Sequence, residues 1–521
     1  MLNTCLKNYK LGVFIVFISK LQITNFKGFI DYTEIEFSDK VNFIIGNNNA
    51  GKSTIFEALA FLENGLHKGE NPDELKNYNA KNKTLEVVAW IKGDFSSLIK
   101  ASSKDLSMFI KNNTIKLIRT DEPLEWHDAK NKIKSLNIKE IGIYNWEKDE
   151  YQNPAGIDKT LNLLVGQYIW ATTNMDEVGS FNKTKIAGKL LESKASEFFN
   201  SDEYKNFIAM HKKLFDDEDG VLQNQLDSLK NEISKNLSEN YGQNLKVKIE
   251  FEAPDTNVFK KNCDFSISES ENNYKPLYSY GDGLQRSVAL ALIEAYANLV
   301  AEEKSSNDSL FFVVDEPEVY LHPKGQENLA NAFVKLSTKS QIFIATHSPY
   351  MIANFRYGND QAFIVKNHKI NKIDNSFSKY SLNHIPSFNE INYLAFGVRA
   401  IEYHNDLYAT FTRVLIEKEI CKSGLENIKE TDRYITEKNI DTKLSDYYKH
   451  FYGKRLIQKN YIKILKDKQR SEMLTLPTYI RNVYHHPEIK SNAQVTPNEV
   501  KQSIHLLQKL LDHREDILKG K

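Results

Sequence analysis

Apolar and polar positions near the start of the chain predict a strand, a small-residue loop and a helix. Residues 41–45 form an apolar run, residues 46–54 are small or polar, and residues 55–62 carry apolar side chains at helical spacing. Two earlier segments, 20–26 and 33–37, alternate apolar and polar positions as half-buried strands do. The first part of the chain is therefore predicted to form strands that lead into a loop before a helix.

Further along, short apolar runs between residues 84 and 180 predict strands, and residues 185–242 predict helices. Within this helical segment, apolar side chains recur every three or four residues, and we expect the stripe to pack in the core or in a short helical hairpin. The stripe consists of Leu222, Leu226, Leu229, Ile233 and Leu237. Beyond about residue 350 the pattern is mostly helical, with a weak strand at 361–365 and a domain boundary expected near 355–385.

Length and composition indicate a soluble protein with two or three domains. The chain has 521 residues, of which 41% are hydrophobic and 26% charged, and its formal net charge is zero. The charge is unevenly distributed: residues 351–521 carry about +8, which leaves about −8 for the rest. A site for a polyanion is therefore expected in the C-terminal third.

The cysteines and the N-terminal apolar run indicate a cytoplasmic protein. Cys5, Cys263 and Cys421 are far apart and form no metal-binding pair, which fits a reducing compartment. Residues 11–18 are apolar, but eight residues are too few to cross a bilayer. We therefore expect this run to be a strand or a packed extension, and no membrane association.

The loop after the first buried strand has the spacing of a phosphate-binding P-loop, Gly46-x4-Gly51-Lys52-Ser53. Glycines let the backbone approach phosphate oxygens, and the following helix directs its free amides at the same anion. Lys52 is predicted to reach the β- and γ-phosphates of ATP, and Ser53 to ligate Mg²⁺. The other loop residues predicted to surround the nucleotide are Asn47, Asn48, Asn49, Ala50 and Thr54.

An apolar strand at 309–314 ends in two carboxylates, Asp315 and Glu316. A buried parallel strand delivers such acids to the carboxyl edge of the sheet, where ligands bind. Asp315 is predicted to hold the Mg²⁺ shell, and Glu316 to orient and deprotonate the attacking water. A second apolar strand at 341–346 ends in His347.

Several of these motifs resemble known families. The run Ile23-x-Asn25-Phe26-Lys27-Gly28-Phe29, together with the P-loop, is similar to the opening of ATP-binding-cassette (ABC) ATPases of the chromosome-maintenance and DNA-repair kind. The segment 315–323, Asp-Glu-Pro-Glu-Val-Tyr-Leu-His-Pro, resembles the overcoming-lysogenization-defect (OLD) ATPases. The resemblance implies that Lys27 lies near the nucleotide and that His347 is a switch histidine that contacts the γ-phosphate.

The same resemblance implies a composite site shared by two subunits. The segment 277–286 looks like a diverged cassette signature, which binds the γ-phosphate of a nucleotide held by the partner subunit. Its candidate residues are Ser279, Gly281, Gly283 and Gln285. Gln167 is a candidate for the glutamine that links the metal to the neighbouring subdomain. A homo-oligomer with an even number of subunits, at least a dimer, is therefore expected.

The C-terminal third offers two further candidates. Basic residues gather at 454–470, for which the alternatives are a solvated helix face and a phosphate-binding patch for nucleic acid. Arg481 and His486 fit the Arg-x4-His pattern of HEPN ribonucleases, with packing or partner contact as the alternative. A metal-dependent nuclease of the topoisomerase-primase kind is not expected, because no Asp-x-Asp pair follows Glu417.

The motifs together predict an α/β fold with an ABC-type ATPase head: a mixed sheet with flanking helices, an antiparallel β layer and a short helical insertion at about 185–242. Residues 1–360 are assigned to this head and residues 361–521 to a mostly helical domain that binds an effector or partner. The whole resembles the ATPase subunits of bacterial anti-phage systems such as Septu, PARIS and some retrons. This implies a regulatory, ATP-hydrolysing subunit that controls a nuclease or toxin; a self-contained ATP-controlled ribonuclease and a DNA-end-binding repair ATPase are the alternatives.

Overall fold

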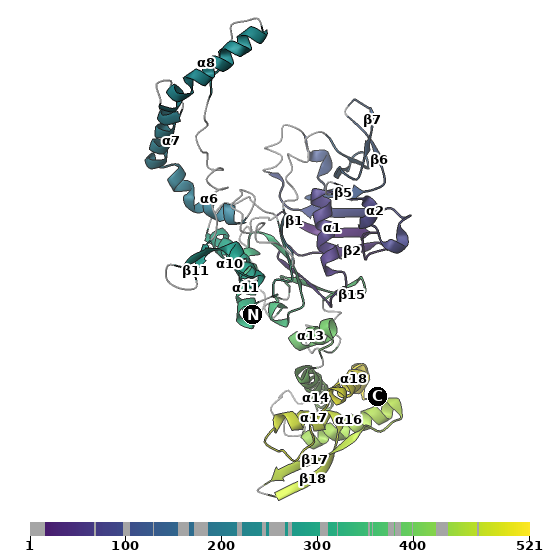
Figure 1. The fold of residues 1–521 in the computed structure, drawn as a ribbon. Coiled ribbons are helices and arrows are strands. Elements are labelled where there is room, and N and C mark those ends of the chain that lie inside the picture. The colour runs from purple at the N-terminus through teal and green to yellow at the C-terminus, as the bar shows by residue number, and fades with distance from the viewer. Residues whose placement is uncertain are drawn as a thin grey trace, which may run out of the picture.

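The computed structural model describes most of the chain, drawn as a coloured ribbon in Figure 1. The described residues are 16–66, 69–96, 105–128, 130–154, 166–170, 186–215, 221–241, 246–249, 266–268, 273–302, 311–319, 321–352, 355–356, 358–373, 380, 387–398, 400–423, 436–465 and 468–520. Residues 11–15 of the N-terminal apolar run lie outside them, and the end of the run belongs to strand β1 (Phe17–Thr24).

A mixed six-stranded sheet forms the centre of the head, in the order β10-β13-β14-β3-β15-β16. All neighbouring pairs are parallel except the last, in which β16 is antiparallel to β15. The interior strands read as nearly continuous apolar runs because both faces of the sheet are covered. The strands are β3 (Val41–Ile45), β10 (Gly166–Ile169), β13 (Phe311–Asp315), β14 (Gln341–Thr346), β15 (Gln361–Lys366) and β16 (Lys369–Lys372).

Successive residues of the central strands point to opposite layers of helices. Phe311 and Val313 pack in one cluster with Phe56 of α1 (Lys52–Asn64), whereas Phe312 packs in another with Phe333 of α11 (Pro323–Leu336). Two more helices join α11 on its face, α10 (Asp282–Glu302) and α12 (Pro349–Ile352). The sheet is thereby buried between two helical layers.

The antiparallel layer predicted beside the sheet is confirmed and has six strands in the order β2-β1-β4-β5-β8-β9. Helix α1 lies between this layer and the mixed sheet, since its apolar side chains share one core with both. Besides β1, the strands are β2 (Thr33–Glu36), β4 (Glu86–Lys92), β5 (Thr114–Thr120), β8 (Gly142–Asn145) and β9 (Glu150–Gln152). Smaller elements of the head are β6 (Leu124–His127), β7 (Ile133–Leu136), β11 (Ser266–Ser268), β12 (Tyr274–Pro276), α2 (Pro72–Leu75), and the 3₁₀ helices η1 (Tyr78–Ala80), η2 (Ser107–Phe109) and η3 (Leu277–Ser279).

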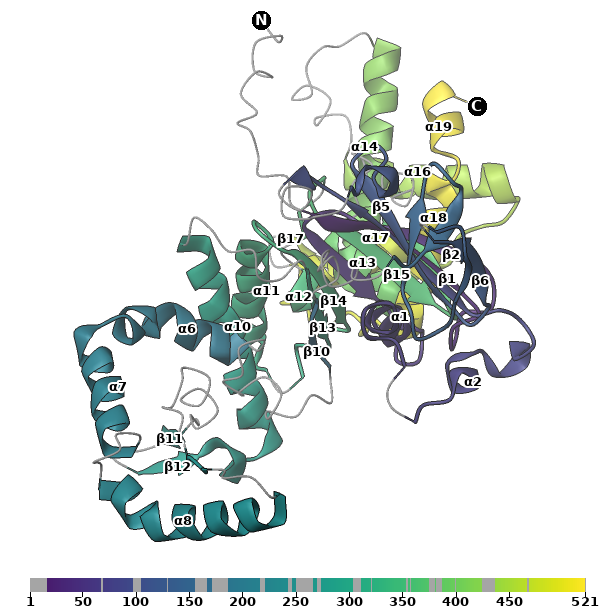
Figure 2. The ribbon, with the colours of Figure 1, turned by 90° about the horizontal axis from the view of Figure 1, so that it is seen from above.

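The predicted helical insertion is also confirmed. It consists of α6 (Ile186–Phe199), α7 (Asp202–Phe215) and α8 (Val221–Tyr241), which project from the head beyond α10 in both views (Figures 1 and 2). The expected packing of the apolar stripe on α8 is wrong for its second half, because Leu229, Ile233 and Leu237 are between 38% and 45% exposed. Helices α7 and α8 meet at a corner in Figure 2 and do not lie side by side, so α7 leaves this part of the stripe without cover.

The C-terminal region is mostly helical, as predicted, with one β-hairpin. Its helices are α13 (Phe388–Phe396), α14 (Ile401–Ser423), α16 (Glu437–Tyr452), α17 (Leu476–His485), α18 (Pro497–Leu511) and α19 (Arg514–Lys519). They pack around a core that contains Phe411, Leu444 and Leu507. Helix α13 lies between the head and α14 (Figure 1).

Two expectations about this region need correction. The boundary at residue 360 divides the ATPase sheet, because β15 pairs with β3 and β16 follows as its edge strand. The basic run at 454–470 is not a helix face, because residues 458–465 form β17 and residues 468–475 form β18. The alternation that buries Tyr461 against α17 while Ile464 stays exposed is the period of a strand.

Candidate active site

The P-loop connects the end of β3 to the first turn of α1. Gly51 precedes the helix with a φ of 105°, in the left-handed region that favours glycine. Gly46 stands so close to β15 that a Cβ there would lie 2.3 Å from the carbonyl oxygen of Val365. Both glycines of the motif are therefore required by the backbone path itself. Asn47, Asn48, Asn49 and Ala50 form the loop between them, and Thr54 lies in the first turn of α1.

The outer side of the P-loop rests on the turn between β15 and β16. The backbone N–H of His368 donates to the carbonyl oxygen of Ala50 over 3.1 Å. The imidazole of His368 stands edge-on to Phe29, with ring centroids 5.8 Å apart, and lies against Gly28 and Gly51. Sequence reasoning missed this contact because it assigned the turn to another domain, and no local signal marks it.

Lys52 is buried and joins the loop to the histidine after β14. Its ammonium group donates to the carbonyl oxygen of Asn47 at 3.1 Å and lies 2.7 Å from Nε2 of His347. Burial lowers the pKa of Lys52, and the nearby carboxylates of Glu316 and Asp315 act in the opposite direction. Lys52 and His347, predicted from separate motifs, are thus brought into direct contact.

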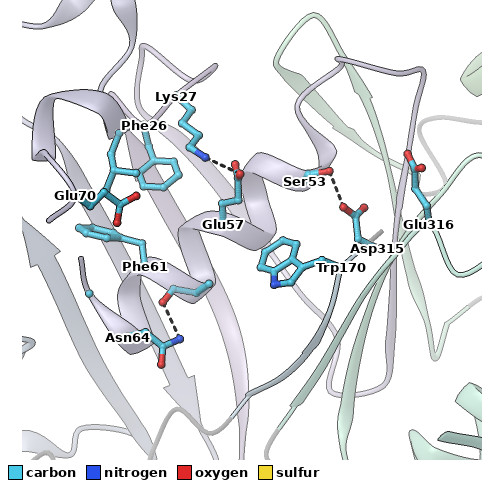
Figure 3. A pocket seen from close by; sticks show the side chains of 13 residues that line it. Phe26, Lys27, Ser53, Glu57, Phe61, Asn64, Glu70, Trp170, Asp315 and Glu316 are labelled. Atoms are coloured by element: carbon cyan, nitrogen blue, oxygen red, sulfur yellow. Dashed lines mark hydrogen bonds and ion pairs between the residues drawn. The ribbon is translucent and has the colours of Figure 1, made fainter. Parts of the chain in front are cut away.

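The two acids stand at the carboxyl end of β13, as predicted. The hydroxyl of Ser53 donates to Oδ2 of Asp315 over 2.9 Å, which places the two predicted metal ligands side by side (Figure 3). Burial raises the pKa of Asp315 to about 6, although the Ser53 hydroxyl partly opposes this. Glu316 has a φ of 48°, in the left-handed region that is uncommon for glutamate. Its Oε1 lies 2.9 Å from Nε2 of His347.

Glu318 is a site residue to which sequence reasoning gave no role. Its Oε1 accepts hydrogen bonds from the hydroxyl of Thr346, at 2.8 Å, and from the backbone N–H of His347, at 2.5 Å. These bonds fix the end of β14 and hence the position of the histidine. The signal was present in the sequence, because Glu318 is the second glutamate of the Asp-Glu-Pro-Glu run.

A pocket of about 570 Å³ extends from Ser53, Asp315 and Glu316 along one side of α1 (Figure 3). Its volume is in the range of small-molecule sites. The predicted nucleotide residue Lys27 lines it, and its ammonium group pairs with Glu57 at 2.6 Å. The pocket therefore joins the acidic end of β13 to the loop that holds Lys27.

Gln167 is not brought beside the metal ligands by the strand register. It lies opposite Phe312, so Asp315 is three residues further along the neighbouring strand, about 10 Å at the usual rise per residue. The candidate signature lies around the start of α10: Ser279 and Gly281 are exposed, Gly283 is in the first turn, and Gln285 donates to the carbonyl oxygen of Tyr280 at 2.7 Å. Helices α10 and α1 are well separated in both views (Figures 1 and 2).

The C-terminal candidates Arg481 and His486 have different surroundings. The guanidinium of Arg481 lies over the ring of Tyr408, 5.4 Å from its centroid, and donates to Oδ1 of Asn482. His486 follows the last residue of α17, is exposed, and lies 3.1 Å from Glu488. The helix ends at the histidine, as the following proline predicts.

The strand, the phosphate loop, the paired acids and the histidine together define a P-loop ATPase. Residues 17–352 match the AAA ATPase domain family, and the chain belongs to that family. No helix among the described residues is long and apolar enough to cross a membrane.

Curated relatives share parts of this sequence. The Old nuclease of Escherichia phage P2 is 28% identical over 330 residues, covering 60% of this chain and 53% of that protein. The endonuclease GajA of Bacillus cereus (strain VD045) is 22% identical over 391 residues, covering 70% of this chain and 60% of that protein. The Retron Vc95 probable ATPase of Vibrio cholerae is 20% identical over 395 residues, covering 64% of this chain and 71% of that protein. The chain thus spans between half and two thirds of the length of the two nucleases.

Solved structures resemble the head at low identity. An Smc head bound to the C-winged helix domain of ScpA aligns over 68% of this chain and 97% of its own, with a TM-score of 0.42 and 14% identity. The recombination mediator protein RecF with ATP aligns over 70% of this chain and 100% of its own, with a TM-score of 0.34 and 16% identity.

Proposed function

We propose that this chain is an ATP-hydrolysing regulatory subunit of a bacterial anti-phage defence complex, and that it controls a nuclease or toxin effector. In this proposal two heads close on ATP, and the C-terminal region holds the effector. The observation that carries the ATPase part is the contact series Lys52–His347–Glu316, which joins the phosphate loop, the strand after the acids and the acid pair in one site.

The Lys52–His347–Glu316 contact series suggests a separate chemical role for each residue. Lys52 and the amides at the start of α1 hold the phosphates, as in other P-loop sites. Glu316, aimed by its left-handed backbone, accepts a proton from the attacking water. His347 lies within 3 Å of both side chains. In this proposal it contacts the γ-phosphate once Lys52 turns from the histidine to the nucleotide.

Mg²⁺ is the expected metal. A serine hydroxyl and a carboxylate, at Ser53 and Asp315, are the hard oxygen ligands that Mg²⁺ prefers, with phosphate oxygens and water completing its shell. Bound there, it would neutralise charge on the β- and γ-phosphates.

The position of the signature segment supports the dimerisation that this proposal requires. Ser279 and Gly281 are exposed, and a Cβ at Gly281 would meet no atom within 4 Å. A second head could therefore approach this segment closely and receive its helix-end donors on the nucleotide.

A surface for the effector is available on the C-terminal hairpin. The face of β17 and β18 that points away from α17 exposes Ile464 and Met473, and Ile457 is exposed just before it. Apolar side chains exposed on one face of a sheet offer apolar area that a partner can bury. Two of the relatives, the Old nuclease and the endonuclease GajA, are nucleases by name, which supports a nuclease as the controlled activity.

ATP turnover by purified protein tests the catalytic assignment. Glu316→Gln should retain ATP binding, measured with a fluorescent ATP analogue, and lose turnover by a factor on the order of 10² to 10⁴, the usual contribution of a general base. Glu327→Gln, which removes an exposed carboxylate on α11, serves as the matched control and should turn over ATP normally. Undiminished turnover in Glu316→Gln refutes the assignment.

A self-contained ribonuclease is the second candidate, favoured by one observation. Both His485 and His486 are exposed at the end of α17, where a proton-transferring imidazole can reach a substrate. If purified protein alone cleaves RNA, and His486→Ala abolishes cleavage while ATP turnover is unchanged, this candidate replaces the effector partner. Cleavage that requires a second protein supports the regulatory subunit.

A further inference from the structure

The C-terminal domain carries a concentrated positive charge. Residues 451–490 contain nine lysines and arginines against three acidic residues, a net charge of +6. Lys459, Lys463 and Arg470 lie on one face of the β17–β18 hairpin, the face that packs on α17. A role for this positively charged surface would depend neither on ATP turnover nor on an effector. It therefore goes beyond the proposed function.

Two cations stand directly opposite each other near the tip of the hairpin. In the β17–β18 register Lys463 pairs with Arg470. Like charges in opposite positions destabilise a strand pair, because their Cβ atoms are only about 5 Å apart. Among the described residues neither side chain forms an ion pair. By contrast, Lys459 on the same face forms an ion pair with Glu499 and lies over the ring of Tyr479.

This face of the hairpin also leads to the end of α17. Tyr461 lies between Lys459 and Lys463 in the strand, and it is buried edge-on against Tyr479 of α17. Helix α17 runs back along β17, and the loop after it is tied to the strand by Asn492, whose side chain bonds both N–H and C=O of Ile462 at 2.8 and 3.1 Å. The loop that follows α17 therefore lies against β17 at Ile462, next to Lys463 in the strand.

An exposed aromatic ring and a further cation complete the surface. Tyr484 is 49% exposed and follows the buried Ile480 by one helical turn, so it lies at the rim of the helix face that packs on the hairpin. Lys490 is exposed two residues before Asn492. Among the described residues of this segment the acids are Glu472, two positions from Arg470 on the same face, and Glu488, which is engaged by His486.

We propose that the end of β17, the start of β18 and the end of α17 form a binding site for single-stranded nucleic acid, here called the hairpin patch: Lys463, Arg470, Tyr484 and Lys490. Phosphates neutralise the opposed cations, and an unpaired base stacks on Tyr484, the combination by which proteins hold single strands. A duplex offers phosphates but no free base, so the exposed ring favours a single strand.

Fluorescence anisotropy with the full chain tests the site. The probes are a fluorescein-labelled oligouridine, the matching oligothymidine and a labelled duplex of the same length. The first two separate RNA from DNA as the source of the single strand, and we expect the duplex to bind more weakly than either. A duplex that binds as tightly as both single strands overturns the assignment.

Variants distinguish the charge from the ring. Lys463→Ala/Arg470→Ala should weaken single-strand binding on the order of tenfold and reduce the slope of log affinity against log salt by about 1.4, the value for two phosphate contacts on a single strand. Tyr484→Ala should weaken binding on the order of tenfold with the slope unchanged.

The control pair, Lys449→Ala/Lys519→Ala, removes the same charge from exposed sites on α16 and α19 and should leave affinity and slope nearly unchanged. The unbound Lys463→Ala/Arg470→Ala protein should melt no earlier than wild type, because the substitution relieves a repulsion. Equal loss of binding in both double variants means that only bulk charge acts, and this overturns the proposal.

Discussion

Glu63, at the end of α1, provides a test of how the burial of an ionisable side chain affects the stability of the head. Its carboxylate accepts hydrogen bonds from the backbone N–H of Gly166 at 3.2 and 3.3 Å, and burial raises its pKa to about 7. A glutamine side chain at this position would keep an oxygen for the same N–H but could not ionise. The substitution Glu63→Gln therefore isolates the effect of the buried charge.

The direction in which pH changes the stability of the folded head follows from the raised pKa of Glu63. The carboxyl favours the folded state while it is protonated, and this contribution is fully present below its ordinary pKa of 4.5 and lost as the pH rises through about 7. Ionising Glu63 at pH 8 costs the folded head about 3 kcal/mol, and at pH 5 below about 1 kcal/mol. Glu63→Gln should thus be close to neutral at pH 5 and stabilising at pH 8.

The assay is the thermal unfolding midpoint of the head at the two pH values. We expect the midpoint of Glu63→Gln to exceed that of wild type by about 5 °C at pH 8, and by about 1 °C at pH 5. Glu125→Gln, an exposed carboxylate on β6, is the control and should shift the midpoint at neither pH. An equal increase in the unfolding midpoint at both pH values refutes the reasoning, because the added stability would then not come from removing the charge of Glu63.

Three other predictions concern the same head. Arg119→Met should lower its unfolding free energy by about 3 kcal/mol in urea titrations, because the buried guanidinium bonds the carbonyls of Leu62, Glu63 and Ile138, whereas Arg455→Met at an exposed site should have little effect. Mg²⁺ affinity of the ATP-bound protein, followed by the fluorescence of Trp170 in the pocket, should fall about tenfold from pH 7 to pH 5 as Asp315, with a pKa of about 6, takes up a proton; a flat profile contradicts this. Gly51→Ala should weaken ATP binding at least about tenfold, because its φ is 105° and a Cβ would lie 2.8 Å from His368, while Gly358→Ala, also at positive φ but in open space, should bind ATP normally.

The contiguous parts of the site could be predicted from the sequence. A P-loop is a single turn whose glycines, lysine and serine act at fixed local spacing, and the acids after an apolar strand reach the sheet edge wherever that strand lies. Gly46 to Ser53, Asp315 and Glu316 were therefore recognisable, and so was the head they belong to, because each motif carries its own strand or helix with it.

Other features of the site depend on contacts between segments that are far apart in the sequence. Only the tertiary structure determined these features. The pairing of β15 with β3 joins residues more than 300 positions apart, and it determines that His368 supports the P-loop and that the head continues past residue 360. The basic run became a hairpin because Tyr461 packs on α17, a neighbour that its own sequence does not contain. Local pattern shows which positions are apolar; the partner that covers them determines whether they form strand or helix, because most of the stabilising free energy comes from that burial.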